Sequence, residues 1–472
     1  MDGLRTPVIR DLAAVVAVAL VFRLPALLTD FWFDEILSYD RFVRRARSIG
    51  DIFFNGALKH DNNHHVNTLT LYLLGEHTNW IVYRLPALIA GLVAVGVVVS
   101  IGRRRSRLEG LISGVLVAAS YVIAVYSTEA RGYAWLLAFA AIGLVALERF
   151  LATGSQRALW AFWVAMSAGL AAHPAILHFY LGALLWSGFR LRATPRDLAR
   201  LHIVPILWIS AWILFVTRGS VVGGGPPWTW REILDGSLAW TLGYPIHTVP
   251  PLVVAGACVA LVIWDTRRLW AEGSDEGLFY VGTILGPVVL MTALSPPYLF
   301  PRYFLVPLFF LLVVAGRRIA ALARSSARGR WAVITVVLLF VTGNAIHVTR
   351  MFQERHGNHS AVVRLLAASA PASDVTVTSW SLDQWTQLPL AFYASRLGLS
   401  DRIEYIPRAE LTRRAATAPP IDWVTEITPP CDAQPPRRRS LPSDGRTYVL
   451  TGSFPVCGPS GMSWYVYSRS GP

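Results

Sequence analysis

The hydrophobic pattern of this 472-residue chain is dominated by apolar runs that alternate with short polar loops. Runs of about 17–22 residues are long enough to cross a bilayer as helices, and slightly shorter ones recur between them. The pattern predicts helices at 8–28, 80–101, 111–127, 133–151, 158–172, 174–190, 201–217, 250–265, 278–294, 303–316 and 331–348. Such an alternation is typical of a polytopic helical membrane protein.

Two stretches depart from this pattern. Residues 29–79 form a long polar loop whose apolar segment 69–74 is too short to span a bilayer, so we expect an interfacial helix there. From about residue 350 the pattern shortens to an amphipathic helix (362–370) and three alternating, strand-like segments (375–380, 447–451 and 463–467), with a Pro- and Arg-rich loop between them. The predicted fold class is therefore an all-α polytopic membrane domain (1–349, about eleven transmembrane helices) followed by a small α/β domain (350–472).

Composition supports this prediction, because 54% of the residues are hydrophobic and the mean hydropathy is +0.45. The net charge of +14 would suit a nucleic-acid-binding protein, but its arginines lie in short loops between the predicted helices, so we exclude that class. Inner loops would carry Arg103, Arg104, Arg105, Arg107, Arg190, Arg192, Arg196, Arg200, Arg267, Arg268, Arg317, Arg318, Arg324, Arg328 and Arg330, and outer loops only Arg131, Arg218, Arg231 and Arg302. The positive-inside rule then places the N-terminus inside, and loop 29–79 and the C-terminal domain on the extracytoplasmic side of the cell membrane.

The three cysteines divide in the same way. Cys258 lies in an apolar run and is expected to be a core residue. Cys431 and Cys457 lie in the predicted extracytoplasmic domain, where an oxidising environment would allow a disulfide between them.

An acidic pair, Asp34 and Glu35, follows the first apolar run among the aromatic residues of segment 31–33. Charge at a membrane boundary is expensive and usually marks function. We predict that Asp34 is a catalytic general base with Glu35 beside it, and that their mutual repulsion raises the pKa of one of them. The alternative is a solvated acidic pair that merely ends the helix.

A second polar cluster, residues 59–68, lies in the same predicted outer loop. Lys59, the only lysine of the chain, is a candidate point charge for a phosphate, although an ordinary surface lysine is the competing interpretation. His64, His65 and Asn67 are candidate residues of a substrate cavity. A divalent metal ion held by the histidines and the acidic pair is left open, but adjacent histidines rarely bind one ion together, so no metal site is assigned.

Arg131 lies in a short predicted outer turn between Glu129 and Tyr133. Its guanidinium is a candidate phosphate ligand that Glu129 would orient, with Tyr133 in the substrate cavity. The competing interpretation is an interfacial salt bridge of little energetic value.

Arg302 and Tyr303 stand at the predicted outer start of the tenth apolar run. Arg302 is a second candidate phosphate ligand, and Tyr303 and His173 are candidates for the walls of the same cavity. An aromatic-belt anchor and a structural histidine are the respective alternatives.

All these clusters fall on the predicted outer face, where separated cations and carboxylates in apolar surroundings suit a substrate with a lipid tail, a phosphate and a hydroxyl-rich head. Neither a Gly-rich phosphate loop nor a dinucleotide fingerprint occurs in the chain. The expected partners are therefore a polyprenyl-phosphate sugar donor, membrane lipid, and a glycan, glycolipid or protein acceptor, with no nucleic acid and no other cofactor assigned.

The order of these motifs resembles that of the GT-C glycosyltransferases, most closely the bacterial branch related to protein O-mannosyltransferases and aminoarabinose transferases. The resemblance covers about residues 20–150 and rests on the acidic pair, on Asn62-Asn63-His64, on Asn67-Thr68-Leu69, on Tyr83-Arg84-Leu85-Pro86-Ala87 and on Tyr126-Ser127-Thr128-Glu129-Ala130-Arg131-Gly132-Tyr133. One departure is His64-His65-Val66-Asn67-Thr68, where many relatives have His-Pro-Pro-Leu-Tyr, and it puts acceptor choice and metal use in doubt.

The resemblance implies inverting transfer of a sugar from a polyprenyl phosphate to an extracytoplasmic acceptor, with Asp34 as the base and Arg131 in the active-site cavity. The strong preference for arginine over lysine suits a high-GC bacterium with mannosyl or arabinofuranosyl envelope polymers. Two other classes compete. A transporter or flippase of lipid-linked sugars would place charges in mid-helix, and a membrane-anchored binding protein would make Asp34 dispensable.

Overall fold

The computed structural model describes residues 2–472 except 222, 224–227, 297, 370–373, 412, 414–420, 429–434, 442–444 and 471–472. The chain forms two compact units. The helical unit comprises Met1–Leu27, Arg41–Gly75 and Ile81–Val348, and the C-terminal unit comprises Leu28–Asp40, Glu76–Trp80 and Thr349–Pro472. Two pieces of the predicted first outer loop, including the acidic pair, thus group with the C-terminal residues.

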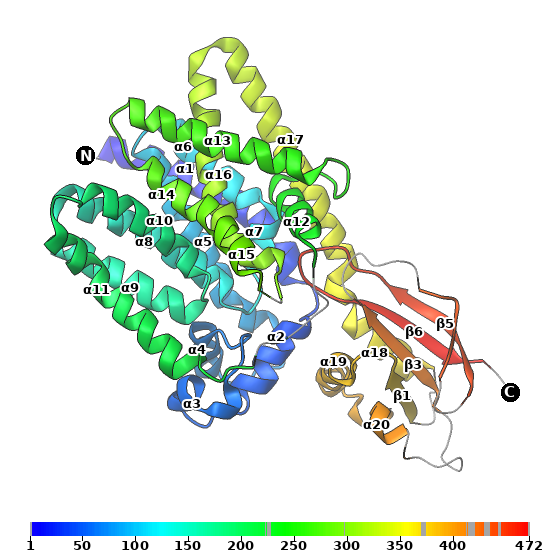
Figure 1. The fold of residues 1–472 in the computed structure, drawn as a ribbon. Helices are drawn as coiled ribbons and strands as arrows, with labels where there is room; N and C mark the ends of the chain where they lie inside the picture. Colours follow the sequence, from blue (N-terminus) through cyan, green and yellow to red (C-terminus); the bar gives the residue numbers. More distant parts are fainter. Residues whose placement is uncertain are drawn as a thin grey trace. The chain divides into compact units, whose positions relative to one another are not determined.

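The helical unit is built from helices that follow the apolar runs (Figure 1). Its elements are α1 (Asp2–Leu27), α3 (Ile49–Phe54), η2 (Gly56–Leu58), α4 (His65–Leu74), α5 (Ile81–Arg103), α6 (Arg107–Ala119), α7 (Tyr121–Tyr126), α8 (Tyr133–Thr153), α9 (Gln156–Ala172), α10 (Ile176–Arg190), α11 (Pro195–Ala211), η3 (Trp212–Thr217), α12 (Trp230–Leu242), α13 (Pro251–Ala271), α14 (Gly277–Tyr280), η4 (Val281–Leu285), α15 (Gly286–Leu294), η5 (Pro301–Phe304) and α16 (Leu305–Ser325). The π-helix η1 (Ser38–Val43) and α17 (Ala327–Glu354) have residues in both units.

The predicted fold class is confirmed, since each of the eleven apolar runs is helical and a small sheet follows them. Among the described residues, six helices are long and apolar enough to cross a membrane: Ile81–Arg103, Tyr133–Thr153, Pro195–Thr217, Gly277–Leu294, Pro301–Ser325 and Ala327–Gly357. Other predicted spans are shorter, such as α9 with 17 residues and α10 with 15. The number of crossings and their direction therefore stay predictions.

One helix, α12, falls where the sequence predicted only loop. Its start carries a capping box, in which Thr229 Oγ1 accepts from the Glu232 amide and the Glu232 carboxylate accepts from the Thr229 amide. This capping signal was present in the sequence. A loop was predicted here because the segment lacks a long apolar run and follows a Gly/Pro-rich stretch.

Close helix packing in the core depends on small residues. A Cβ at Gly316 of α16 would lie 2.2 Å from Ser113 Oγ of α6, and one at Gly182 of α10 would lie 1.9 Å from Thr283 Oγ1 of η4. Larger side chains at either glycine would force the helices apart, as expected where backbones approach closely.

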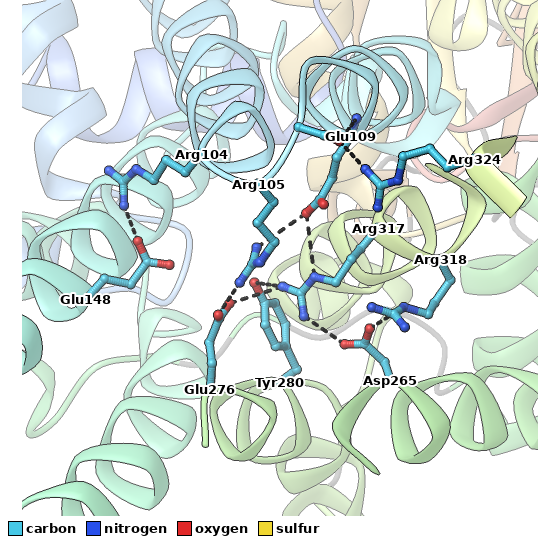
Figure 2. A network of polar contacts seen from close by, with 11 residues as sticks. Arg104, Arg105, Glu109, Glu148, Asp265, Glu276, Tyr280, Arg317, Arg318 and Arg324 are labelled. Carbon is cyan, nitrogen blue, oxygen red and sulfur yellow. Dashed lines mark hydrogen bonds and ion pairs between the residues drawn. The ribbon is translucent and has the colours of Figure 1, made fainter. Parts of the chain in front are cut away.

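A network of buried charges joins one end of α6, α13, α14 and α16 (Figure 2). At its centre Arg317, 1% exposed, donates to Asp265 at 2.9 Å, to Glu276 at 3.1 Å and to the Tyr280 hydroxyl at 2.9 Å. Glu109 Oε1 lies 3.6 Å from Arg317 Nε. The network also contains Arg104, Arg105, Glu148, Arg318 and Arg324 (Figure 2). Its residues come from the loops and helix ends predicted to face the cell interior.

The C-terminal unit contains a six-stranded sheet with strand order β2-β1-β3-β6-β5-β4. Its elements are α2 (Phe33–Leu37), η6 (Arg355–Gly357), α18 (His359–Ala368), β1 (Val375–Ser379), α19 (Asp383–Arg396), η7 (Ser400–Arg402), β2 (Ile403–Tyr405), α20 (Arg408–Leu411), β3 (Trp423–Thr428), β4 (Arg438–Ser440), β5 (Thr447–Phe454) and β6 (Ser463–Arg469). The strands β2, β1 and β3 are parallel and the rest are antiparallel.

Alternation along the strands separates the two faces of this sheet. Trp464 donates from its indole to His359 of α18, so this face is covered by α18 and α19 (Figure 1). Tyr465 and Tyr467 point the other way, into a cluster with Val424 and Tyr448. The strands predicted at 375–380, 447–451 and 463–467 are thus confirmed, whereas the sequence missed β3 and α19.

The predicted disulfide lies partly outside the described residues, because Cys431 is not among them. Cys258 is a free cysteine on α13. The pairing of Cys431 with Cys457 therefore stays a prediction.

Candidate functional site

The loop that precedes α4 is held in shape by Asn63. Its side-chain amide donates to the carbonyls of Ile52 and Leu58, each at 3.2 Å, and its Oδ1 accepts from the Thr68 hydroxyl at 2.9 Å. With its neighbour fixed in this way, the loop presents Asn62 and His64 to the turn between α7 and α8.

Arg131 lies in that turn and is 2% exposed. Its Nη2 donates to Asn62 Oδ1, and its Nη1 lies 3.8 Å from Glu129 Oε2. The guanidinium carbon also stands 4.9 Å from the centre of the Tyr133 ring. The sequence placed Arg131 with Glu129 and Tyr133 because they are close in the chain, but the contact with Asn62 spans 69 positions.

Gly132 allows His64 to lie directly against the turn. A Cβ at Gly132 would lie 2.0 Å from the Ala172 carbonyl oxygen and 2.9 Å from His64 Cβ, so no larger residue fits. The Gly132 amide donates to His64 Nδ1 at 2.9 Å. Because Nδ1 is the acceptor of an amide hydrogen, the neutral ring carries its proton on Nε2.

His173, between α9 and α10, is held in the same tautomer. Its Nδ1 accepts from the Ala175 amide at 3.0 Å, so Nε2 carries the proton. The centre of its ring lies 5.0 Å from that of His64, 4.7 Å from that of Tyr133 and 6.4 Å from that of Tyr303. Two imidazoles from distant loops therefore stand side by side with an N–H donor each.

Burial and nearby cations keep both rings neutral. Burial is the largest cause that lowers the pKa of His173, to about 3, and Arg131 and Arg302 lower it further. The same causes hold the pKa of His64 well below its usual 6.5. Arg131 lies in the turn that contacts His64, and the ring of Tyr303, which Arg302 approaches, lies 6.4 Å from that of His173. The two cations and the two N–H donors therefore belong to one site.

Arg302 enters this site from η5. Its guanidinium carbon lies 4.2 Å from the centre of the Phe300 ring and 5.9 Å from that of Tyr303. Stacking on an aromatic face orients a guanidinium. The described helical unit thus brings Arg131, Arg302, His64, His173, Glu129, Tyr133 and Tyr303 together.

Other predicted site residues have structural partners. The Lys59 ammonium donates to the carbonyls of Phe215 at 2.9 Å and Arg218 at 3.2 Å, at the end of η3. Asn67 donates to the Ala130 carbonyl at 2.7 Å and so fixes the turn beside Arg131. These two contacts already account for the position of the Lys59 ammonium. A phosphate role for Lys59 stays a prediction.

His65 faces away from its neighbour His64. Its ring lies 5.3 Å from that of Phe53 and 4.8 Å from that of Trp212, and burial lowers its pKa to about 4. The structure therefore gives His65 a packing role, and its predicted place in the substrate cavity is not tested.

Asp34 and Glu35 lie in α2 of the C-terminal unit. Glu35 is fully buried and its Oε2 accepts from the Trp32 amide at 3.2 Å. Asp34 is half-buried, and its carbonyl accepts from the Ser38 hydroxyl at 2.8 Å. The two adjacent carboxylates are thus in different environments, with Glu35 the more enclosed.

The segment that carries this pair is tied to the C-terminal residues. The Asp30 carboxylate accepts from the Ser360 amide at 2.7 Å and from its hydroxyl at 3.1 Å, and Thr29 Oγ1 lies 2.9 Å from His356 Nδ1. Phe31 stacks on Phe392 with a ring separation of 5.7 Å. No periodicity of the sequence indicated that residues about 330 positions apart hold this turn together.

Among the described residues, no group of three or more His, Cys, Asp or Glu side chains is arranged to hold a metal ion. Besides the Glu129 carboxylate beside Arg131, the site contains N–H donors and guanidinium cations. Fixed donors of this kind suit an oxyanion such as a phosphate.

Comparison with known proteins concerns the fold. No protein-family model matches the chain, and no curated protein matches it in sequence. The apo oligosaccharyltransferase of Archaeoglobus fulgidus has a TM-score of 0.51 at 10% identity, covering 89% of this chain and 69% of that chain. Apo ArnT from Cupriavidus metallidurans has a TM-score of 0.48 at 12% identity, covering 98% of both chains. The chain thus shares its fold with the archaeal oligosaccharyltransferase, as the resemblance to GT-C glycosyltransferases implied.

Proposed function

We propose that this protein is an integral-membrane inverting glycosyltransferase that moves a sugar from a polyprenyl phosphate to an extracytoplasmic acceptor. The observation that carries the proposal is the clustering of two arginines around the His64–His173 pair, whose ring centres lie 5.0 Å apart. Arg131 lies in the turn whose Gly132 amide donates to His64, and Arg302 lies 5.9 Å from the Tyr303 ring, which is itself 6.4 Å from that of His173. Two fixed cations and two N–H donors suit a phosphate that gains charge as it leaves.

The reaction that such a site supports is a single displacement. The acceptor oxygen attacks the anomeric carbon, the bond from that carbon to the phosphate oxygen breaks, and the phosphate keeps the electron pair. Arg131, Arg302 and the two Nε2–H groups stabilise the charge that develops on the leaving phosphate. The donor needs no further activation, because its phosphate is already a leaving group.

A base must take the proton of the acceptor hydroxyl, and we assign this role to Asp34. A general base typically accelerates such a step by about 10²–10⁴-fold. Asp34 is the less enclosed carboxylate of the pair, whereas Glu35 binds the Trp32 amide and shapes the turn. Glu35 is therefore expected to hold Asp34 in position.

We propose mannose or arabinofuranose as the sugar and a cell-envelope glycan, glycolipid or protein as the acceptor. The basis for the sugar is the preference for arginine over lysine, which suits a high-GC bacterium with mannosyl or arabinofuranosyl envelope polymers. The basis for the acceptor is the predicted outer position of every polar cluster. The C-terminal unit would then also lie outside the membrane.

A transfer assay tests the proposal. Purified wild-type and Asp34→Asn proteins would be given a panel of polyprenyl-phosphate sugars, with and without chelator. We expect the wild type to consume one donor and Asp34→Asn to be at least about 100-fold slower. The chelator arm decides whether a divalent metal takes part. Movement of a labelled lipid-linked sugar between vesicle leaflets without any transfer would instead favour a flippase.

A further inference from the structure

Asp61 is a carboxylate at the edge of the anion site that the mechanism above does not use. It directly precedes Asn62, whose Oδ1 accepts from Arg131, and it lies three positions before His64. About a third of its side chain, 33%, is exposed. The site therefore presents a negative group beside its cations.

Two contacts fix one oxygen of this carboxylate. Asp61 Oδ1 accepts from the Gly223 amide at 3.0 Å and lies 2.7 Å from His60 Nδ1. The Asp61 amide in turn donates to the Val221 carbonyl at 3.0 Å. A Cβ at Gly223 would lie 3.0 Å from His60 Cε1 and 3.2 Å from Asp61 Oδ1, so a glycine allows this close crossing of two loops.

The carboxylate is ionised and acts on the same groups as the arginines. Burial by itself would raise the pKa of Asp61, but His60, the Gly223 amide and Arg302 together lower it. Its negative charge in turn opposes the fall in the pKa of His173. Asp61 thus belongs electrostatically to the site around Arg302 and His173.

A carboxylate beside a phosphate site is unfavourable for a bare phosphate, because like charges repel. It becomes favourable when the ligand also brings hydroxyl groups, since an ionised carboxylate can only accept hydrogen bonds. The contacts with Gly223 and His60 both involve Oδ1, so Oδ2 is the oxygen that we expect to accept from a ligand.

We propose that Asp61 binds hydroxyl groups of the donor sugar and so distinguishes the sugar-loaded carrier from bare polyprenyl phosphate. This inference rests on the proposed function and assigns the sugar-binding side of the same site. Gly223 is a positioning residue, because its amide fixes the orientation of the carboxylate. A site built to accept from substrate hydroxyls discriminates strongly against ligands that lack them.

Binding measurements on the purified full-length protein test this role. The probes are bare polyprenyl phosphate, polyprenyl-phosphate mannose and polyprenyl-phosphate arabinofuranose. In Asp61→Asn we expect the Kd of the better sugar-loaded probe to rise by about tenfold or more, the loss of one or two hydrogen bonds to a charged group. The Kd of bare polyprenyl phosphate should stay the same or fall, because a repelling charge is removed.

Asp51→Asn is the matched control, because Asp51 is a carboxylate of the same outer loop that accepts from the backbone amides of Arg47 and Ser48. It should leave all three constants unchanged. The inference is overturned if Asp61→Asn weakens the binding of bare and loaded carriers equally, or if it weakens neither. Failure of the proposed function is a separate result, namely unchanged binding of bare polyprenyl phosphate in Arg302→Ala.

Discussion

The hydroxyl of Tyr393 donates a hydrogen bond to the Phe31 carbonyl at 2.9 Å and accepts one from the Phe31 amide at 2.6 Å. The two residues are 362 positions apart. A buried side chain of α19 thus forms hydrogen bonds with both backbone groups of Phe31, in the turn that leads into Asp34. This gives the C-terminal unit a specific role, since it holds the segment that carries the proposed base.

Tyr393→Phe is expected to affect turnover more than donor binding. The variant loses both hydrogen bonds to Phe31, which should lower the free energy of unfolding by about 1–3 kcal/mol. Because the turn before Asp34 is then less firmly held, we expect a several-fold fall in the transfer rate with little change in the Kd of polyprenyl phosphate.

The control for this experiment is Tyr405→Phe. Tyr405 donates to Asp383 within the same unit at 2.6 Å, so its loss should also reduce stability but leave the transfer rate unchanged. Equal effects of both substitutions on turnover would refute a specific role of Tyr393.

Arg131→Ala should weaken the binding of polyprenyl phosphate. A hydrogen bond to a charged group contributes about 1.5–3 kcal/mol, so the Kd should rise by roughly 10- to 100-fold. The measurement is a titration of the detergent-solubilised protein with polyprenyl phosphate. Arg231→Ala removes an exposed arginine of α12 and should bind like the wild type.

Because Arg131 also contacts Asn62 and Glu129, its removal can disturb the fold. Arg302→Ala provides the second variant, and the unfolding temperature of each is recorded. An unchanged Kd in both folded variants would exclude a phosphate site at this position.

Arg317→Met should be strongly destabilising. Removal of one partner from a buried charge network typically costs about 3–5 kcal/mol, because Asp265 and Glu276 would keep their charges without their main counter-ion. The unfolding temperature of the purified protein should fall accordingly, whereas Arg268→Met, at an exposed position of α13, should change it little.

Neutralising the two carboxylates that contact Arg317 should restore part of the stability that Arg317→Met loses. In a background of Asp265→Asn and Glu276→Gln, we expect Arg317→Met to be less destabilising, since the energies of contacting residues are coupled. Equal losses in both backgrounds would show that packing of the long side chain, and not its charge, stabilises this end of the helices.

Acid should destabilise the protein through its buried imidazoles. The pKa of His173 is about 3 in the folded protein, against 6.5 for an ordinary histidine, and that of His64 is also lowered. Between these pH values the unfolded chain binds more protons than the folded protein, so the free energy of unfolding falls as the pH decreases from about 6.5 towards 3. Above about pH 7 the two histidines no longer change the free energy of unfolding.

Unfolding temperatures at several pH values between about 4 and 8 measure this dependence. The unfolding temperature of His173→Gln should fall less steeply below pH 6.5 than that of the wild type, because one of the two histidines with a lowered pKa is gone. The Kd of a polyprenyl-phosphate sugar should not change between pH 6 and 8, since both rings remain neutral donors there and a phosphate diester has no second ionisation in this range. A clear histidine titration of donor binding in that range would contradict the lowered pKa of the two rings.

The sequence by itself determined the helical frame and several elements of the C-terminal sheet. Apolar runs report burial or lipid contact directly, because every backbone group in a membrane must be paired within a helix. The turn at Arg131 was also identifiable, since Glu129, Arg131 and Tyr133 are neighbours in the chain. Alternation likewise marked β5 and β6, whose side chains point in turn to the two faces of the sheet.

Tertiary structure decided what distant residues do together. The sequence could not show that His64 and His173 stand 5.0 Å apart, or that backbone amides fix the tautomer of both rings. It grouped His65 with His64 because they are adjacent, but successive helix positions point about 100° apart, so His65 faces Trp212. Nor could it show the hydrogen bonds between Phe31 and Tyr393, because nothing in the local pattern encodes them.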